Sequence, residues 1–393
     1  MTGRRRIAEL CAPIDPKEFF GFLLACGFSE EGYFEYNRHL NLDRDKPLGL
    51  ITEFCETVCE RPSYFKPNPD VDIERSLDLI KNCGVENIEF LNAILSAFGR
   101  ALVNDHWFKN PSMGENFDKF SDEQIATFIS YRKFRALPYF VFGDSHSRLY
   151  QHLRILPGGF WSLPLKITFS AASARGLGNP KSHLQNASRI CSIFERIEPF
   201  IRSERIRSFI KFGQVDLEYV YPFKRIATQK NDFEYCDFLS FCETSVSKYF
   251  EFLKKVFPED IRDLITICSV CPPVLADEEW PEGYVMGNFG GRISIERARE
   301  EINRASQIKN PDISQRTWLH REFSCRLEKE ACLGGFDYLD DAVPFLRSDG
   351  MCVDEKYTRL SKGKDTHLDR GTPTLKIMDQ IILAEVSKSN EAA

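Results

Sequence analysis

The chain has 393 residues, 42% of them hydrophobic and 28% charged, and a formal net charge of −6 at pH 7. This length predicts two domains, and this composition is typical of a globular protein. A nucleic-acid partner is not expected, because phosphate binding requires a basic face. A membrane partner is not expected either, because no apolar run approaches the roughly 18 residues that span a bilayer.

The 13 cysteines indicate a reducing environment. They are scattered without the spacing of a disulfide framework, so we expect free thiols and a cytoplasmic location. Cys268 and Cys271 form a lone CxxC pair. Without a second pair or nearby histidines this pair predicts no zinc site, and no other metal or cofactor is expected. Packing of the two thiols is the simpler interpretation, and redox chemistry is the alternative.

Residues 1–134 are predicted to form a helical domain. Residues 72–82 are amphipathic, and residues 86–103 repeat apolar side chains such as Ile88 and Leu91 at helical spacing. This part of the chain carries no recognisable catalytic constellation, so its sequence indicates no role for it.

Residues 135–393 are predicted to form an α/β domain of three layers, with a parallel sheet between two layers of helices. Short apolar runs alternate there with amphipathic stretches, which is typical of this architecture. The expected strands are residues 137–142, 165–169, 208–212, 264–270 and 336–339. The expected helices are residues 182–197, 233–257, 295–305 and 313–333, and a last helix that begins at Thr372.

The tetrapeptide Gly143-Asp144-Ser145-His146 directly follows the first of these strands. A serine on a strand-to-helix turn points its hydroxyl out of the carboxyl edge of the sheet, where open α/β folds place their ligands. The helix N-terminus offers N–H groups and a partial positive charge to a developing anion. The position therefore predicts a nucleophilic serine, and the alternative is that Ser145 serves only as a helix N-cap.

Polar or glycine-containing segments also follow the second and third strands and precede the last helix. They contain Gly176, Gly178 and Asn179 after the second strand, Gly213, Gln214 and Asp216 after the third, and Asp365 and His367 before the last helix. Since the carboxyl ends of parallel strands share one edge of a sheet, we expect these segments to converge. Convergence would bring Ser145 beside amide donors and a histidine base, which are the requirements of a serine hydrolase.

The order and spacing of these segments resemble the SGNH, or GDSL-type, hydrolase superfamily over residues 136–393. The match is to a poorly characterised branch whose first block reads Gly-Asp-Ser-His. The resemblance implies an SGNH-hydrolase or flavodoxin-like fold, with Ser145 as nucleophile and His367 as base. It also implies that the N–H of Gly176 or Gly178 stabilises the oxyanion.

The function implied by this resemblance is that of a serine-dependent acyl-ester hydrolase or O-acyltransferase. Members of the branch often accompany glycan-modifying enzymes, so the expected partner is a small-molecule or glycan ester, with a carbohydrate-type ester favoured. The alternative is a weakly active or inactive protein of this type that binds a glycan or a protein partner. The sequence does not indicate an oligomeric state.

Two positions depart from the family pattern. Val215 occupies the place of an asparagine donor in the third block, and losing one oxyanion donor typically costs about 10²–10³ in turnover. Gln214 and Asn179 are the candidate replacements. Lys364 stands where the family has the triad aspartate.

The candidate triad acid is therefore Asp365, two residues before His367. In an extended or turn segment residues two apart share a face, so this carboxylate can orient the imidazole. A Ser145–His367 pair oriented by a backbone carbonyl is the alternative.

Five further residues have two interpretations each. Asp144 is expected to bond turn amides rather than to react, and His146 to line the pocket or to be solvated. Arg175, like Arg148, is expected to grip an anionic substrate or simply to be solvated. Asp216 either meets the substrate or holds its loop.

Residues 272–292 form a connection rich in proline, glycine and acidic residues. Connections this long are often functional, so we expect a lid over the cleft, with a plain surface connection as the alternative.

Overall fold

The computed structural model describes residues 117–152, 156, 160–179, 185–289, 292–358 and 365–391. Most of the predicted helical domain, residues 1–116, lies outside the described residues, as does Lys364. Internal contacts divide the chain into two compact units, residues 1–138 with 153–163 and residues 139–152 with 164–393.

Residues 117–134 of the first unit are largely helical. They contain the 3₁₀ helices Phe117–Lys119 (η3) and Tyr131–Phe134 (η4), and between them α7, Asp122–Ser130. A capping box begins α7: Ser121 Oγ accepts the N–H of Gln124, and the Gln124 side chain accepts the N–H of Ser121.

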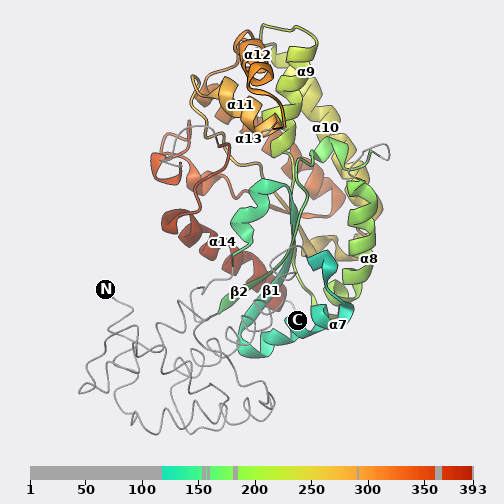
Figure 1. Ribbon diagram of the computed structural model, residues 1–393. Coiled ribbons are helices and arrows are strands. Elements are labelled where there is room, and N and C mark those ends of the chain that lie inside the picture. The colour runs from blue at the N-terminus through green and yellow to red at the C-terminus, as the bar shows by residue number, and fades with distance from the viewer. Residues whose placement is uncertain are drawn as a thin grey trace, which may run out of the picture. The chain divides into compact units, whose positions relative to one another are not determined.

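The α/β part of the chain is built on a five-stranded sheet with the order β2-β1-β3-β4-β5 (Figure 1). The strands are β1 (Ala136–Gly143), β2 (Trp161–Thr168), β3 (Ser208–Lys211), β4 (Ile265–Cys268) and β5 (Asp337–Leu339). β1, β3, β4 and β5 pair in parallel register. β2 runs parallel to β1, because the Trp161 N–H bonds Arg135 O at the strand starts and the Phe169 N–H bonds Gly143 O at the ends. The predicted parallel sheet is confirmed, in the strand order of flavodoxin-like folds.

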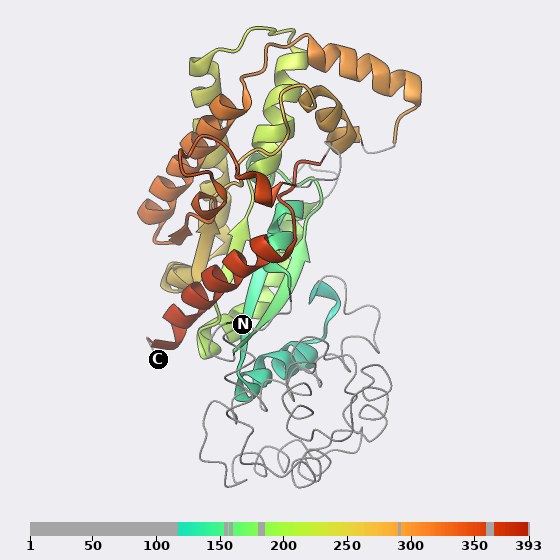
Figure 2. The same ribbon diagram turned by 90° about the vertical axis from the view of Figure 1, so that its left-hand side faces the viewer.

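Helices cover both faces of this sheet. They are α8 (Asn186–Glu204), α9 (Tyr221–Ala227), α10 (Tyr235–Val256), α11 (Trp280–Phe289), α12 (Ile295–Ser306), α13 (Ile313–Gly334) and α14 (Thr372–Glu391). α8 and α14 lie on opposite sides of the sheet (Figures 1 and 2), which gives the three predicted layers. Among the described helices, none has the length and apolar character needed to cross a membrane.

Two of these helices were not predicted. α9 follows a π-helical turn, Asp216–Val220 (η8). α11 lies inside the connection predicted as a lid or a surface link, and its buried Trp280, Tyr284 and Val285 pack in one cluster with Ala305 at the end of α12. The connection is thus partly helical and anchored by apolar contacts, and a lid role stays a prediction.

The strand order places a ligand crevice between β1 and β3. All residues of β1, β3 and β4 are buried, as expected for parallel strands covered on both faces. The order reverses between β1 and β3, and open α/β sheets bind ligands beyond the carboxyl ends of the strands at such a switch point. Ser145 follows β1, and residues 213–216 follow β3.

A buried ion pair joins the end of β3 to the segment that follows β5. Lys211 Nζ donates to Asp341 Oδ2 at 2.6 Å, and the same carboxylate accepts the hydroxyls of Tyr150 and Ser269 at 2.7 Å each. Burial alone would lower the pKa of Lys211, but the charge of Asp341 raises it above its ordinary value. The carbonyl of Lys211 in turn accepts the N–H of Asp144 at 3.2 Å, so a residue of this pair is also bonded to the residue before Ser145.

Lys211→Met is expected to leave Asp341 as an uncompensated buried charge. The free energy of unfolding should fall by about 3–5 kcal/mol, as for other buried pairs that lose one partner. Urea denaturation measures the loss, and Lys309→Met, which removes an exposed ion pair with Asp232, is the control. A Lys211→Met protein as stable as this control would contradict a structural role for the pair.

Candidate active site

Ser145 begins a 3₁₀ helix, Ser145–Tyr150 (η5), directly after β1. Gly143 permits the turn, because a Cβ atom there would lie 2.6 Å from Lys211 O and 2.4 Å from Ser147 Cβ. Asp144 is the N-cap of η5, and its carboxylate accepts the N–H of His146. Ser145 is therefore not the cap. Its own N–H lies in the first turn, where N–H groups have no partner within the helix.

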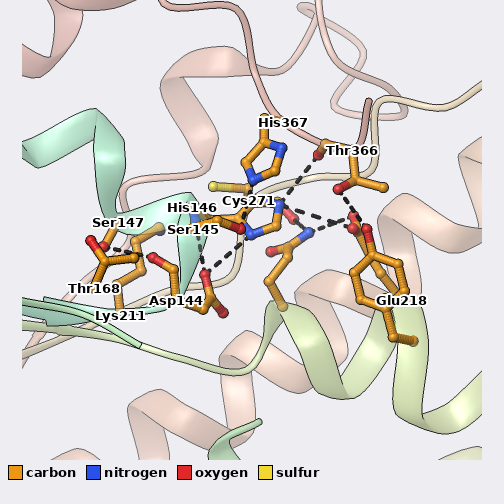
Figure 3. A network of polar contacts seen from close by, with 12 residues as sticks. Asp144, Ser145, His146, Ser147, Thr168, Lys211, Glu218, Cys271, Thr366 and His367 are labelled. Atoms are coloured by element: carbon orange, nitrogen blue, oxygen red, sulfur yellow. Dashed lines mark hydrogen bonds and ion pairs between the residues drawn. The ribbon is translucent and has the colours of Figure 1, made fainter. Parts of the chain in front are cut away.

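Ser145, His367 and Asp365 form a hydrogen-bonded series (Figure 3 draws the serine and the histidine). His367 Nε2 lies 2.7 Å from Ser145 Oγ across 222 positions of sequence. His367 Nδ1 bonds Asp365 Oδ1, which also accepts the backbone N–H of His367 at 3.1 Å. The carboxylate, not the backbone carbonyl considered as an alternative, orients the ring. The order of contacts is that of a serine–histidine–carboxylate triad.

The environment of His367 favours the neutral ring. Burial lowers its pKa below the ordinary value, the hydrogen bond with Asp365 opposes this, and the charge of His146 adds to the lowering. A neutral imidazole whose Nδ1 is held by a carboxylate presents Nε2 as an acceptor to the serine hydroxyl. The ring can therefore serve as a general base near neutral pH.

His146 belongs to a second turn of the same kind. Asp144 Oδ1 accepts the backbone N–H of His146 at 2.8 Å and lies 3.1 Å from its ring Nδ1. His146 Nε2 lies 3.3 Å from the carbonyl oxygen of Thr366, and the ring stacks on that of His367 with centroids 4.3 Å apart (Figure 3). His146 is thus buried against the His367 ring and is not solvated.

Glu218 on η8 completes the buried polar cluster. Its Oε2 atom lies 3.9 Å from His146 Nε2, and its Oε1 accepts the side-chain amide of Gln214 at 2.8 Å. Burial alone would lower the pKa of His146, but the hydrogen bond and charge of Asp144 and the charge of Glu218 raise it. Burial raises the pKa of Glu218 above its ordinary value.

Ser145 opens onto a pocket of about 510 Å³. It is lined by four predicted site residues, Ser145, His146, Asp365 and His367, and by Arg148, Leu149, Cys271, Leu368 and Arg370. Across the described ranges, no cluster of three or more His, Cys, Asp or Glu side chains has the geometry of a metal site. The pocket therefore offers a serine hydroxyl, an imidazole and two guanidinium groups.

The loop after β2 is held by Asp216. This buried carboxylate accepts the N–H of Ala174 at 2.6 Å and that of Arg175 at 3.2 Å. Burial raises the pKa of Asp216 to about 7, and these two hydrogen bonds act in the opposite direction. Asp216 was predicted to meet the substrate or to hold its own loop after β3; the structure instead shows it holding the loop after β2, because its carboxylate is buried against the N–H groups of that loop. Gly176 N–H donates to Ser173 Oγ at 3.0 Å, so this predicted oxyanion donor is already bonded within its own turn.

The rest of this loop packs toward α10. A Cβ atom on Gly178 would lie 3.3 Å from Phe252 Cβ, and the Arg175 guanidinium lies 5.6 Å from the ring centre of Phe241. Asn179 is exposed, and its N–H bonds the carbonyl of Gly176. Together with Gly176, these predicted binding residues are not among those that line the Ser145 pocket.

Residues of the loop after β3 also form contacts within the protein. Gly213 has φ +118° and packs where a Cβ atom would meet Phe323 and Val270. The Gln214 amide donates to Glu218 Oε1 and, at 3.1 Å, to the carbonyl of Cys271. Gln214 therefore has no amide hydrogen left for an oxyanion in this arrangement, and it does not line the pocket.

The sequence missed Glu218, Thr366, Cys271 and Arg370 as parts of the site. Thr366 and Arg370 flank His367 and could have been found as neighbours of the predicted base. Nothing in the sequence distinguishes Glu218, since its role depends on the π-helical turn η8. Cys271 lines the pocket, but burial raises its pKa to about 12 and also raises that of Cys268. Two buried, protonated thiols argue against the redox alternative.

Asp216→Asn tests how the loop after β2 is held. A carboxylate accepts two N–H groups, whereas an asparagine side chain has one acceptor and one donor group, so Ala174 or Arg175 would lose its acceptor. The free energy of unfolding should fall by about 1–3 kcal/mol, as measured by urea denaturation. Asp263→Asn, on an exposed side chain, is the control. Equal stability of the two variants would contradict the role of Asp216 in holding the loop after β2.

Comparison with known proteins gives only weak structural likeness. No family model matches the sequence, and no curated protein matches it. Among solved structures, a GDSL-like lipase from Bacteroides thetaiotaomicron is similar, with 12% sequence identity, a TM-score of 0.31, and coverage of 68% of this chain and 98% of that chain. Because this likeness is so weak, the chemistry of the site rests on its own geometry.

Proposed function

We propose that the protein is a serine-dependent acyl-transfer enzyme, an ester hydrolase or an O-acyltransferase. The observation that carries this proposal is the contact of 2.7 Å between Ser145 Oγ and His367 Nε2, with Asp365 on the other nitrogen of the ring. The series opens onto a pocket at the carboxyl edge of a parallel sheet, where such folds bind ligands. A nucleophile, a base and an orienting group in hydrogen-bond contact are what covalent acyl transfer requires.

In the first half-reaction Ser145 Oγ bonds to the carbonyl carbon of the ester while its proton passes to His367 Nε2. The carbonyl oxygen takes up the negative charge of the tetrahedral intermediate. When the intermediate collapses, the bond to the alcohol oxygen breaks and His367 returns the proton to that oxygen. An alcohol leaves, and the acyl group stays as an ester on Ser145.

In the second half-reaction an acceptor hydroxyl replaces the alcohol. His367 takes the acceptor proton, the acceptor oxygen bonds to the acyl carbon, and the proton then passes to Ser145 Oγ as its bond to carbon breaks. Water as acceptor gives a hydrolase, and a sugar hydroxyl gives a transferase. The carbohydrate-type ester expected as substrate rests on the sequence resemblance alone.

The Ser145 N–H is the donor best placed for the oxyanion, since it begins η5 beside the nucleophile. The N–H of Gly176 and the amide of Gln214 already donate elsewhere. With a single preorganised donor we expect slow turnover, because each missing donor costs about 10²–10³ in rate. A covalent probe that needs one turnover is therefore the suitable assay.

Because the N–H of Gly176 and the amide of Gln214 already donate elsewhere, a second candidate function is also favoured. It is a catalytically weak protein that binds a glycan or a protein partner. The two candidates differ in one property. An enzyme has an activated Ser145, whereas a binding protein has a serine no more reactive than others on its surface.

A fluorophosphonate probe followed by intact-mass spectrometry separates the two candidates. We expect one adduct on the wild type, formed as Ser145 Oγ displaces fluoride from phosphorus, and none on Ser145→Ala or His367→Ala. Asp365→Asn should slow labelling by about 10² or more, because the ring loses its orienting carboxylate. Ser170→Ala, on an exposed loop serine, should label as the wild type does.

The absence of an adduct on folded wild-type protein would contradict the enzyme and leave the binding protein. An adduct that persists in Ser145→Ala would contradict the assignment of the nucleophile.

A further inference from the structure

Two Asp-x-His segments, residues 144–146 and 365–367, form the same turn, and each contacts the other. In each, one carboxylate oxygen contacts both the backbone N–H and the ring Nδ1 of the histidine two positions later. Each histidine then reaches the middle residue of the other segment: His367 Nε2 meets Ser145 Oγ, and His146 Nε2 meets the carbonyl oxygen of Thr366. The two rings stack at an interplanar angle of 19° (Figure 3).

The partners of the two rings require different protonation states. A hydroxyl can donate, so His367 Nε2 can accept and the ring can be neutral. A carbonyl oxygen and a carboxylate oxygen can only accept, so His146 must donate from both nitrogens. Only the imidazolium form satisfies both contacts of His146.

The buried carboxylates around His146 require the same positive charge. Asp144 and Glu218 are both buried, and Asp144 Oδ2 has no hydrogen-bond donor within the described part of the chain. Two buried carboxylates without a cation would be costly. An imidazolium between them, 3.1 Å from Asp144 and 3.9 Å from Glu218, offsets that cost.

We propose that His146 is a positioning residue of the active site: its imidazolium ties the Ser145 turn to the His367 segment and keeps the stacked His367 ring uncharged. The inference rests on the proposed acyl-transfer function. The tether acts on the immediate neighbours of the nucleophile and the base, because Asp144 precedes Ser145 and Thr366 precedes His367. A positive charge 4.3 Å from a second imidazole disfavours protonation of that imidazole.

Other titratable groups near His146 do not replace its charge. They are Asp144 on its own turn, Glu218 on η8, Asp365 and His367 in the segment before α14, Cys271 after β4, and His320 and Arg316 on α13. Burial lowers the pKa of His320 to about 4, with the charges of Arg316 and His146 adding to the effect. His320 and Cys271 are therefore neutral near pH 7, and Arg316 bonds Asp277 at 2.7 Å.

The test is the pH profile of fluorophosphonate labelling in two matched variants. His146→Gln is neutral and keeps an amide donor that can reach Thr366 O, whereas His146→Asn is neutral and too short to reach it. The labelling rate rises with pH as His367 loses its proton, so the midpoint reports the pKa of His367. Without the neighbouring cation this midpoint should rise by at least about one pH unit in both variants. The plateau rate at high pH should fall about tenfold or more in His146→Asn only, because the tether is lost.

The outcomes separate this inference from the proposed function. Folded variants that label with the wild-type midpoint would overturn the role of His146 while leaving the enzyme intact. A wild type that does not label at all would instead contradict the proposed function.

A second measurement covers the case in which neither variant folds. Nitrogen-detected NMR of the wild-type histidine rings as a function of pH should show one ring that keeps both nitrogens protonated above the ordinary histidine pKa of about 6.5. A protein in which no histidine ring titrates above that value would overturn the buried imidazolium.

A separate observation concerns the charge of the pocket wall. Arg148 and Arg370 line the pocket beside Ser145, both are exposed, and neither forms an ion pair within the described ranges. Lys166 on β2 is half-buried, and burial lowers its pKa with the nearby charge of Arg148 adding to the effect. By contrast, Arg202, Arg207 and Arg316 each form an ion pair with a carboxylate.

We infer that the pocket binds an ester carrying an anionic group, a carboxylate or a phosphate, held by Arg148 and Arg370. Guanidinium groups bind such anions through paired, charge-assisted hydrogen bonds. An anion there would also relieve the repulsion between Arg148 and Lys166. This inference rests on the proposed function and names a feature of its substrate.

Two pairs of synthetic esters test the inference and locate the charge. For the acyl side the pair is 4-nitrophenyl hexanoate and the mono-4-nitrophenyl ester of adipic acid. For the alcohol side the pair is the acetyl esters of methyl 4-hydroxybenzoate and of 4-hydroxybenzoate. In one pair the anionic member should have a kcat/KM at least about tenfold higher, as one charged hydrogen bond supplies. That ratio should fall in Arg148→Gln and in Arg370→Gln.

Ser145-dependent hydrolysis with no preference in either pair would overturn the anionic substrate and leave the enzyme. No Ser145-dependent hydrolysis of any of the four esters would contradict the proposed function itself.

Discussion

The site depends on one buried carboxylate, that of Asp144. Its Oδ1 atom accepts the backbone N–H of His146 and lies 3.1 Å from the same residue's ring, while its own N–H is bonded to Lys211 on β3. Ser145 lies between these contacts, so the end of β1, the start of η5 and the orientation of His146 are set together. The His146 ring then reaches Thr366, which places the neighbouring His367 against Ser145. A hydrogen bond within one turn thus organises a contact across 222 positions of sequence.

The two stacked histidines show how a fold gives one local motif two electrostatic states. Both belong to Asp-x-His turns with the same internal bonds, so the turn alone does not set their pKa values. What differs is the partner of Nε2, a hydroxyl for His367 and a carbonyl for His146, together with the buried Glu218 on the His146 side. The pKa of His367 is lowered and that of His146 is raised. The nearby carboxylates raise the pKa of His146, whereas burial and the charge of His146 lower the pKa of His367.

The sheet was predictable because most of its strands are apolar runs that end in turn residues, which is the usual pattern of parallel strands buried on both faces. Helices α10, α12 and α13 agree with the predicted ranges because each has an apolar stripe, which sequence spacing reveals. The sequence did not reveal α11, whose first turn contains a proline and whose interior contains glycine. The predicted oxyanion donors Gly176 and Gln214 illustrate a different limit. Their residue types suit the role, but Ser173 in one case and Glu218 with Cys271 in the other already accept their N–H groups.

The sequence by itself determined the features that depend on near neighbours. These are the parallel sheet, the serine on a strand-to-helix turn, and the ability of Asp365 to orient a histidine two residues away, since each follows from residue type and short-range spacing. Only the tertiary structure decided which groups face one another across the carboxyl edge. It brought His367 to Ser145, stacked His146 beneath it, added Glu218, and directed Asp216 and Gln214 to internal contacts. Those outcomes depend on how strands and turns distant in sequence pack together, because burial and long-range hydrogen bonding, not local spacing, select the partners of each polar group.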